Sequence, residues 1–194
     1  MNRIYNVPDK LNNKGLWVQK YKIGDTTYDT RSGILWNNMK MRVNKASTLK
    51  NRCYQDTKIL FEGFQEFAGW CQGEYGHMLV DSKMRFWCLD KDISSGTNYG
   101  PETCIFVPAS VNNLFVDLTT ANGYSYHKGS GMFQVRCCGE YIGMYQSELE
   151  AASIYKKAKL IVLKELNTDE IVKDHTKFQS FLLKIIREWE EEDK

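Results

Sequence analysis

The most constraining pattern in the chain lies in residues 123–164, where three short strand-forming segments precede one helix. The segments GYSYHK, MFQVRCC and EYIGMY are rich in aromatic and other strand-forming residues, and Gly-containing turns separate them. Ser147 then offers a helix N-cap, with Glu148 and Glu150 in the first turn, where acidic side chains suit the helix dipole. We therefore expect a three-stranded antiparallel sheet with one packed helix, whose small-residue face is formed by Ala151, Ala152, Tyr155, Ala158 and Val162.

A second amphipathic helix is predicted near the C-terminus. Apolar residues recur there at helical spacing, at Phe178, Phe181, Leu182, Ile185, Ile186 and Trp189. We expect this stripe to dock onto the rest of the chain, with a host protein or a second copy of the chain as the alternative partner. Residues 165–194 also form an acidic tail.

The chain has 194 residues, of which 42% are hydrophobic and 26% charged, and this composition excludes a mostly disordered protein. No apolar run reaches the length of about 18 residues that a membrane span needs. The opening MNRIYNVPDK lacks the apolar stretch of a signal peptide. We expect no membrane contact and a cytoplasmic location.

The six cysteines form no CxxC pair, so the sequence favours buried free thiols over a disulfide framework. A zinc site on Cys53, Cys71, Cys88 and Cys104 is the alternative. It is disfavoured because structural zinc sites usually take their ligands in close pairs.

The first half of the chain predicts a mixed α+β core. The first fifty residues indicate short strands or irregular structure, and helical spacing then predicts helices near 34–45 and 61–71. Residues 75–93 indicate a strand, a turn and a strand, and residues 103–115 a strand that leads into a helix beginning near 108–110. The order around the acidic pair Asp90 and Asp92 is therefore β-β-α.

The segment GYSYHKGSGMFQVRCCGEYIGMYQSELEAASIYKKAK resembles the apetala-two, or ethylene-response-factor, type of DNA-binding domain. In that family the sheet lies in the major groove of double-stranded DNA, where strand side chains can meet base edges. Residues 122–164 carry six Lys or Arg against three Glu, which is compatible with this role. The resemblance implies DNA contacts by Tyr126, His127, Lys128, Phe133, Gln134 and Arg136.

The segment WCLDKDISSGTNYGPETCIFVPASVNNLF resembles the HNH, or His-Me finger, region of phage and intron-borne endonucleases. The resemblance implies a β-β-α unit that holds one Mg²⁺ or Mn²⁺ between Asp90 and Asn112, with Asn113 as a second candidate on the helix. For a phage protein, the resemblance also implies a location in the cytoplasm of the host cell. On the residues alone, Asp90 and Asp92 could instead be a solvated pair at a strand end.

Two positions depart from that family pattern. Lys91 stands where the general-base His is expected, and Thr103 stands where an Asn usually orients that His. Lysine has an unperturbed pKa of about 10.4 and is a poor base at neutral pH unless its surroundings lower that value. Lys91 with a depressed pKa, or His77 on the preceding predicted strand, would have to act as the catalytic base.

These patterns predict an α+β protein with a β-β-α metal-finger core. The expected segments are an N-terminal extension (1–50), a nuclease-like domain (51–118), a DNA-binding domain (119–164) and the C-terminal helix with its tail (165–194). The expected function is a DNA endonuclease of phage or mobile-element type that nicks duplex DNA. The alternative is a catalytically degenerate relative that acts by occupying DNA or by interfering with a host enzyme.

Overall fold

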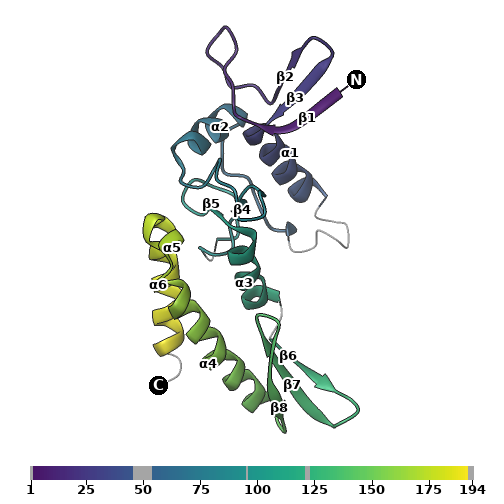
Figure 1. The fold of residues 1–194 in the computed structure, drawn as a ribbon, viewed down its shortest axis with the longest axis vertical. Coiled ribbons are helices and arrows are strands. Elements are labelled where there is room, and N and C mark those ends of the chain that lie inside the picture. Colours follow the sequence, from purple (N-terminus) through teal and green to yellow (C-terminus); the bar gives the residue numbers. More distant parts are fainter. Residues whose placement is uncertain (1, 46–53, 95, 121–122, 192–194) are drawn as a thin grey trace. The chain divides into compact units, whose positions relative to one another are not determined.

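The computed structural model describes residues 2–45, 54–94, 96–120 and 123–191, and it divides the chain into two compact units (Figure 1). Unit 1 is Met1–Ala109, and unit 2 is Ser110–Lys194. The boundary falls inside the range 51–118 that was expected to form one nuclease-like domain. Helices and strands both contribute to each unit, so the α+β class is confirmed.

Unit 1 begins with a three-stranded sheet that leads directly into a helix. Its strands are β1 (Asn2–Val7), β2 (Lys20–Ile23) and β3 (Thr26–Thr30), in the order β1-β3-β2, with β1 parallel and β2 antiparallel to β3. Helix α1 (Arg31–Asn44) follows without a loop, because the Thr30 side chain accepts a hydrogen bond from the Gly33 backbone N–H and caps the helix. The expected helix at 34–45 is confirmed and starts three residues earlier.

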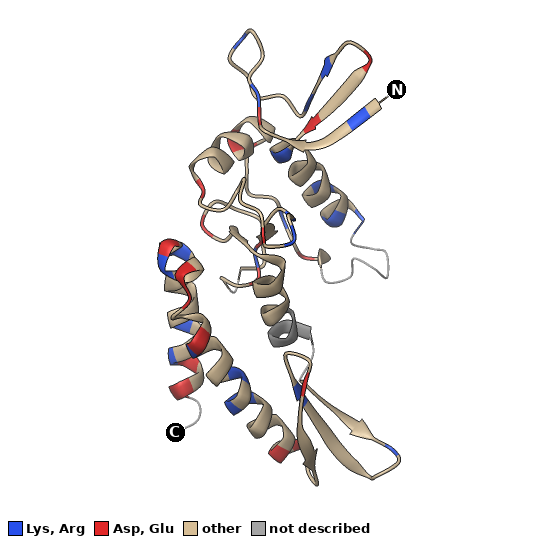
Figure 2. Cartoon of the chain, in the orientation of Figure 1, with Lys and Arg blue, Asp and Glu red and all other residues tan. Residues whose placement is uncertain are grey.

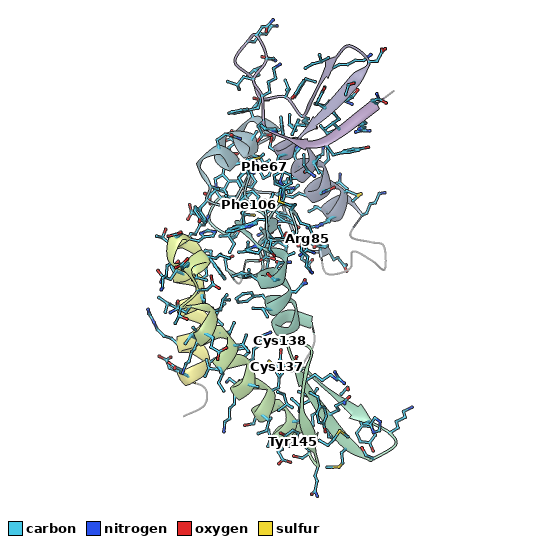
Figure 3. The ribbon with its side chains drawn as sticks, in the orientation of Figure 1. Phe67, Arg85, Phe106, Cys137, Cys138 and Tyr145 are labelled. Carbon is cyan, nitrogen blue, oxygen red and sulfur yellow. The ribbon has the colours of Figure 1, made fainter. Side chains whose placement is uncertain are left out.

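The core of unit 1 lies where α1 meets helix α2 (Phe64–Gly73) and the antiparallel pair β4 (Cys88–Asp90) and β5 (Ile105–Val107). Residues from the expected N-terminal extension belong to this core. Figure 3 marks Phe67 and Phe106 within it. Its buried members are Leu35, Trp36, Met39, Phe61, Phe67, Cys71, Trp87, Tyr99, Cys104 and Phe106.

The prediction of a strand at the start of 75–93 is wrong. Residues 75–78 form a turn, and a single bridge between Val80 and Phe86 is what remains of the predicted strand pair ahead of β4. Gly76 explains the difference, because its φ of +91° favours glycine and a Cβ there would lie 2.5 Å from the Trp87 ring. The backbone must approach that ring closely, and a turn at Gly76 provides the approach.

Unit 2 contains the predicted sheet and helix. Helix α3 (Ala109–Thr120) precedes strands β6 (Tyr124–His127), β7 (Met132–Cys137) and β8 (Glu140–Tyr145), which pair antiparallel in that order. Helix α4 (Glu148–Leu166) begins at the expected cap, where the Ser147 side chain accepts a hydrogen bond from the Glu150 backbone N–H. The elements β4, β5 and α3 also follow one another in the expected order.

The C-terminal helix docks onto its own chain, as expected. Helix α5 (Glu170–Asp174), which the sequence did not indicate, leads into α6 (Thr176–Glu191), and α6 packs against α4 and α5. The rings of Phe115 on α3 and Phe178 on α6 meet edge to face at 6.0 Å. Phe178, Leu182, Ile185 and Ile186 are all buried. Among the helices that the structure describes, none is long and apolar enough to cross a membrane.

The docking of α6 predicts a large difference between two leucine substitutions. Leu182 is fully buried, whereas Leu149 on α4 is 82% exposed. Leu182→Ala should lower the free energy of unfolding by about 2–5 kcal/mol, because a buried cavity replaces the side chain. Leu149→Ala should change it by less than about 0.5 kcal/mol. Urea unfolding followed by circular dichroism measures both, and similar values for the two variants would contradict the packing.

Candidate nucleic-acid interface

Helix α4 covers one face of the β6-β7-β8 sheet and thereby defines the other face as open. Val135 and Cys137 on β7 pack with Ala151 and Tyr155 on α4 into a small buried core. Gly123 makes this packing possible, because a Cβ at this position, where φ is +67°, would lie 2.0 Å from the Tyr155 ring. The side chains that alternate with Val135 and Cys137 along β7 therefore project away from the helix.

The open face carries polar and aromatic side chains in cross-strand pairs. Ser125 lies opposite Gln134, and Arg136 lies opposite Tyr141. Residues directly opposite each other in an antiparallel pair share a face. Ser125, Gln134 and Arg136 line one shallow hollow of about 260 Å³ together with residues of the β7-β8 turn. This hollow could receive a base edge or a phosphate group.

The β7-β8 turn positions Arg136. The turn residues Cys138 and Gly139 have φ values of +54° and +90°, as in the tight turns that suit twisted hairpins. The Gly139 carbonyl accepts a hydrogen bond of 3.2 Å from Arg136 Nη1. A bulge between Val135 and Arg136 places Ile142 outside the regular register of β8. Since a guanidinium has five N–H donors, the others stay available for a ligand.

The six expected DNA contacts do not share one face. His127, Gln134 and Arg136 lie on the open face, and Lys128 lies in the β6-β7 turn. Phe133 packs on the α4 side, and the Tyr126 ring meets it at 5.3 Å. Ser125, Tyr141 and Met144 belong to the open face and were not expected as contacts. Side chains alternate between the two faces along each strand, and counting this alternation from an apolar Val135 could have predicted them from the sequence.

The basic residues of α4 contribute little charge to the open face. Lys159 is fully buried, with its Nζ 3.9 Å from Cys138 Sγ. Lys164 pairs with Glu190 of α6 at 2.6 Å, and Lys156 lies over the Trp189 ring at 5.8 Å. Figure 2 shows the corresponding alternation of blue and red along α4 and α6, while the strands of the sheet are mostly uncharged. Three of the six basic residues counted in 122–164 thus serve the packing of the helices.

The carboxylate of Asp90 organises the turn after β4. Asp90 Oδ1 accepts hydrogen bonds of 2.8 Å from the backbone N–H groups of Asp92 and Ile93. Burial raises the pKa of the Asp90 carboxyl despite these two hydrogen bonds. Within the described part of the chain Asp90 Oδ2 makes no hydrogen bond, so one hard oxygen could still ligate a divalent cation.

The side chain of Lys91 is used in packing. It is only 5% exposed and forms an ion pair with Asp92. The rings of Tyr54 and Tyr99 lie 5.4 and 5.8 Å from its Nζ. The side chain is therefore committed to Asp92 and to the two rings and is not exposed to an attacking water. Thr103, at the other position that departs from the family pattern, holds the segment 96–104 by donating to the Asn98 carbonyl at 2.7 Å.

His77 also has a packing role, and it lies in a turn and not on the strand on which it was expected. Its Nε2 lies 2.8 Å from Asp9 Oδ2, and its side chain is 4% exposed. Asp9 also accepts hydrogen bonds from Ser32 Oγ at 2.7 Å and Gln72 Nε2 at 2.7 Å. Burial opposes the charged form of Asp9, but these hydrogen bonds outweigh it and hold the pKa of the carboxyl below its ordinary value. The resulting network ties the segment after β1 to α1 and α2.

The remaining metal candidates lie on α3. Asn112 Oδ1 is buried and has no hydrogen-bond partner among the residues described, whereas Asn113 is exposed. No group of three or more His, Cys, Asp or Glu that could hold a metal occurs in the described ranges. Of the cysteines in the alternative zinc site, Cys53 lies outside those ranges. Cys71 and Cys104 are buried in the apolar core of unit 1, and burial raises the pKa of Cys71.

Comparisons with known proteins add no relative. No family model, curated protein or solved structure matches the chain. The resemblances to the apetala-two and HNH families therefore stay predictions that rest on the quoted motifs.

Because Asp90 is buried, we predict that Asp90→Asn stabilises the protein by an amount that depends on pH. Above the ordinary value of 3.8 the unfolded chain is ionised, while the folded state resists ionisation, so this group lowers stability as pH rises. Asp90→Asn keeps the Oδ1 acceptor and removes the charge. Its stability relative to wild type should therefore increase from pH 3 to pH 7.

Asp81 provides a control of opposite sign, because hydrogen bonds from the Arg85 side chain and backbone lower the pKa of its carboxyl. Asp81→Asn should lose stability relative to wild type over the same pH range. Thermal unfolding at each pH measures both variants. Parallel behaviour of the two would contradict the assigned surroundings of Asp90.

Proposed function

We propose that the chain binds duplex DNA through the open face of the β6-β7-β8 sheet. The observation that carries this proposal is the arrangement of Ser125, Gln134 and Arg136 around one hollow on a sheet whose other face is covered by α4. Gln and Arg are the side chains that make bidentate contacts with adenine and guanine in the major groove. A two-stranded ribbon or a small sheet fits that groove.

The sparse charge of this face sets the character of the binding. Arg136 and Lys128 are its exposed cations, since α4 covers the opposite face, where Lys159 is buried, Lys156 and Lys164 contact α6, and Lys157 is exposed. Each phosphate neutralised by Lys or Arg releases condensed counterions and steepens the salt dependence of the affinity. We expect about two phosphate contacts per sheet, so the affinity should fall only slowly as salt concentration rises. Contacts with base edges and aromatic side chains should then supply a larger share of the binding free energy.

We further propose that the β4-β5-α3 segment is a nuclease-like scaffold without catalysis. Lys91 supports this, because its ammonium is occupied by Asp92 and enclosed by two tyrosine rings. His77 supports it too, because its Nε2 faces Asp9 and its other ring nitrogen, Nδ1, is buried, so neither nitrogen reaches a water at a phosphate. In this reading the chain acts by occupying DNA, or by interfering with a host enzyme there.

Substitution of Arg136 tests the interface. Arg136→Gln should weaken binding to duplex DNA about tenfold or more, since one Arg contact to a base is worth about 1–3 kcal/mol. Arg187→Gln removes the same charge from the exposed side of α6 and should leave the affinity unchanged. Fluorescence anisotropy with labelled duplexes at several salt concentrations measures both. Equal affinities for Arg136→Gln and wild type would exclude the proposed face.

A metal-dependent nicking endonuclease is the second candidate, and two oxygen atoms favour it. In unit 1 Asp90 Oδ2, and in unit 2 the buried Asn112 Oδ1, are without hydrogen-bond partners in the described ranges, and each by itself is a hard ligand that suits Mg²⁺ or Mn²⁺. Asn113, which is exposed on the same helix as Asn112, is a further candidate metal ligand. Such an ion would stabilise the charge that develops on the phosphate during hydrolysis.

Supercoiled plasmid incubated with Mn²⁺ separates the two candidates. We expect wild-type protein to leave the plasmid intact, because neither Lys91 nor His77 is placed to accept a proton. Nicking that is abolished in Asp90→Asn but retained in Asp56→Asn, an exposed site in unit 1, would establish the endonuclease instead. Agarose gel electrophoresis resolves the nicked and supercoiled forms.

A further inference from the structure

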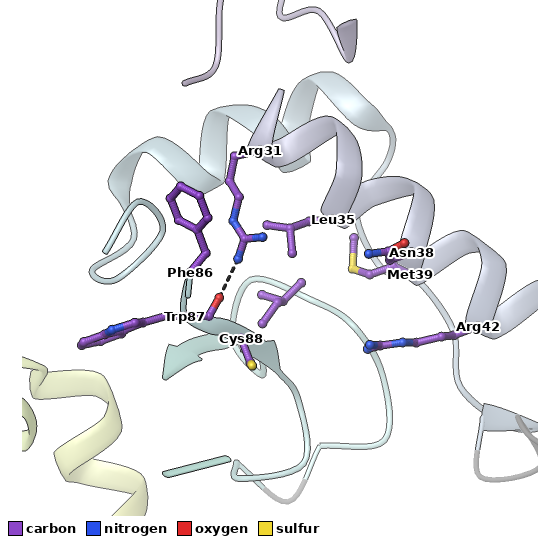
Figure 4. A pocket seen from close by; sticks show the side chains of 9 residues that line it. Arg31, Leu35, Asn38, Met39, Arg42, Phe86, Trp87 and Cys88 are labelled. Carbon is purple, nitrogen blue, oxygen red and sulfur yellow. Dashed lines mark hydrogen bonds between the residues drawn. The ribbon is translucent and has the colours of Figure 1, made fainter. Parts of the chain in front are cut away.

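A hollow in unit 1 carries two arginine side chains and lies apart from the sheet residues proposed to bind DNA. It is enclosed by α1 and residues 86–89 and has a volume of about 190 Å³ (Figure 4). Arg31 and Arg42 line it from the two ends of α1, and Leu35, Met39 and Phe86 supply apolar wall. The close-up shows both guanidinium groups directed from the helix toward the segment that contains Cys88.

Arg31 is a buried cation whose hydrogen-bonding capacity is only partly used. Its exposed fraction is 7%. Nη2 donates to the Trp87 carbonyl at 2.5 Å, Nη1 donates to Asn6 Oδ1 at 3.1 Å, and the guanidinium lies 5.0 Å from the Phe86 ring centroid. Its Nε is buried and has no partner among the described residues. Neutral acceptors and a ring thus surround this charge.

Arg42 approaches the same hollow three turns further along α1. Its Nη1 donates to the Tyr99 hydroxyl at 3.2 Å, and its guanidinium lies 5.8 Å from the Tyr54 ring centroid. Within the described ranges no carboxylate lies within ion-pairing distance of Arg31 or Arg42. Asp9 is the acidic group that acts on Arg31 through space, and it is already committed to His77, Ser32 and Gln72.

Two guanidinium groups lie beside one small hollow with no ion-paired carboxylate among the residues that the structure describes, and an anion would correct this charge imbalance. Burial of a charge is costly unless it is paired and hydrogen-bonded. The planar guanidinium fork matches the oxygen atoms of a phosphate group, and these pairs are among the strongest hydrogen bonds in proteins. A phosphate monoester carries up to two negative charges at neutral pH, which equals the positive charge of the two arginines.

We propose that this hollow is a binding site for a small phosphate-class oxyanion, either inorganic phosphate or the terminal phosphate of a small organic monoester. Arg31 would hold the anion through the part of its side chain that lines the hollow, and Arg42 would close the site from the other end of the helix. The apolar wall of Leu35, Met39 and Phe86 would accept the organic part of a monoester. This site is independent of the DNA-binding proposal, because none of its residues belongs to the sheet.

Isothermal titration of the full chain with inorganic phosphate, against sodium chloride at equal ionic strength, tests the site. Wild type should bind one phosphate saturably. Arg42→Gln should weaken that binding about ten- to a hundredfold, the range expected for one charge-assisted hydrogen bond. Lys40→Gln removes an exposed charge from the same helix, outside the hollow, and should bind phosphate as wild type does.

Two further arms keep the test decisive. If Arg42→Gln fails to fold, Arg42→Lys keeps the charge but loses the fork and should weaken binding by a smaller factor. Phenyl phosphate that binds more tightly than inorganic phosphate assigns the site to an organic monoester, and equal affinities assign it to the free anion. Absence of saturable binding to wild type, equal binding by the Arg42 variants, or displacement of phosphate by duplex DNA would overturn the proposal.

Discussion

The packing of α4 against one face of the β6-β7-β8 sheet is the constraint on which the candidate interface depends. It buries Val135 and Cys137 under Ala151 and Tyr155, and it requires a residue without a Cβ at Gly123. Because strand side chains alternate, this burial fixes which residues face outward. Ser125, Gln134 and Arg136 are exposed to a ligand for the same reason that Val135 is buried.

The residues that resemble a nuclease centre serve the stability of unit 1. Asp90 caps a turn, Lys91 is enclosed beside Tyr54 and Tyr99, and His77 belongs to a network centred on Asp9. A buried lysine that already holds an ion pair, and a buried histidine whose Nε2 faces a carboxylate and whose Nδ1 is inaccessible, are poorly placed to activate water. The structure thus provides a physical reason why DNA binding is a better-supported proposal than cleavage.

Local signals in the sequence predicted much of the fold. The Ser147 cap, the Gly-containing turns of the sheet and the apolar stripe of α6 each depend on neighbouring residues, and all three were confirmed. The failures came from contacts that are distant in sequence. The turn at Gly76 is required by its approach to Trp87, and the partner of His77 lies 68 residues away.

The candidate site was only partly predictable for the same reason. A count of basic residues assigned the lysines of α4 to the DNA-binding module, but their use depends on α6. Lys164 pairs with Glu190, and Lys156 lies over Trp189. Neither contact can be recognised from the segment that resembles the apetala-two family. The buried state of Lys159 likewise follows from three-dimensional packing and has no signature in its immediate neighbours.

Hydrogen exchange of the full chain with and without duplex DNA tests the central claim most directly, because it locates the bound surface without a substitution. The account predicts that DNA slows amide exchange in residues 123–145 and leaves the segments around Asp90 and His77 unchanged. Protection confined to unit 1, with residues 123–145 exchanging as in the free protein, would contradict it.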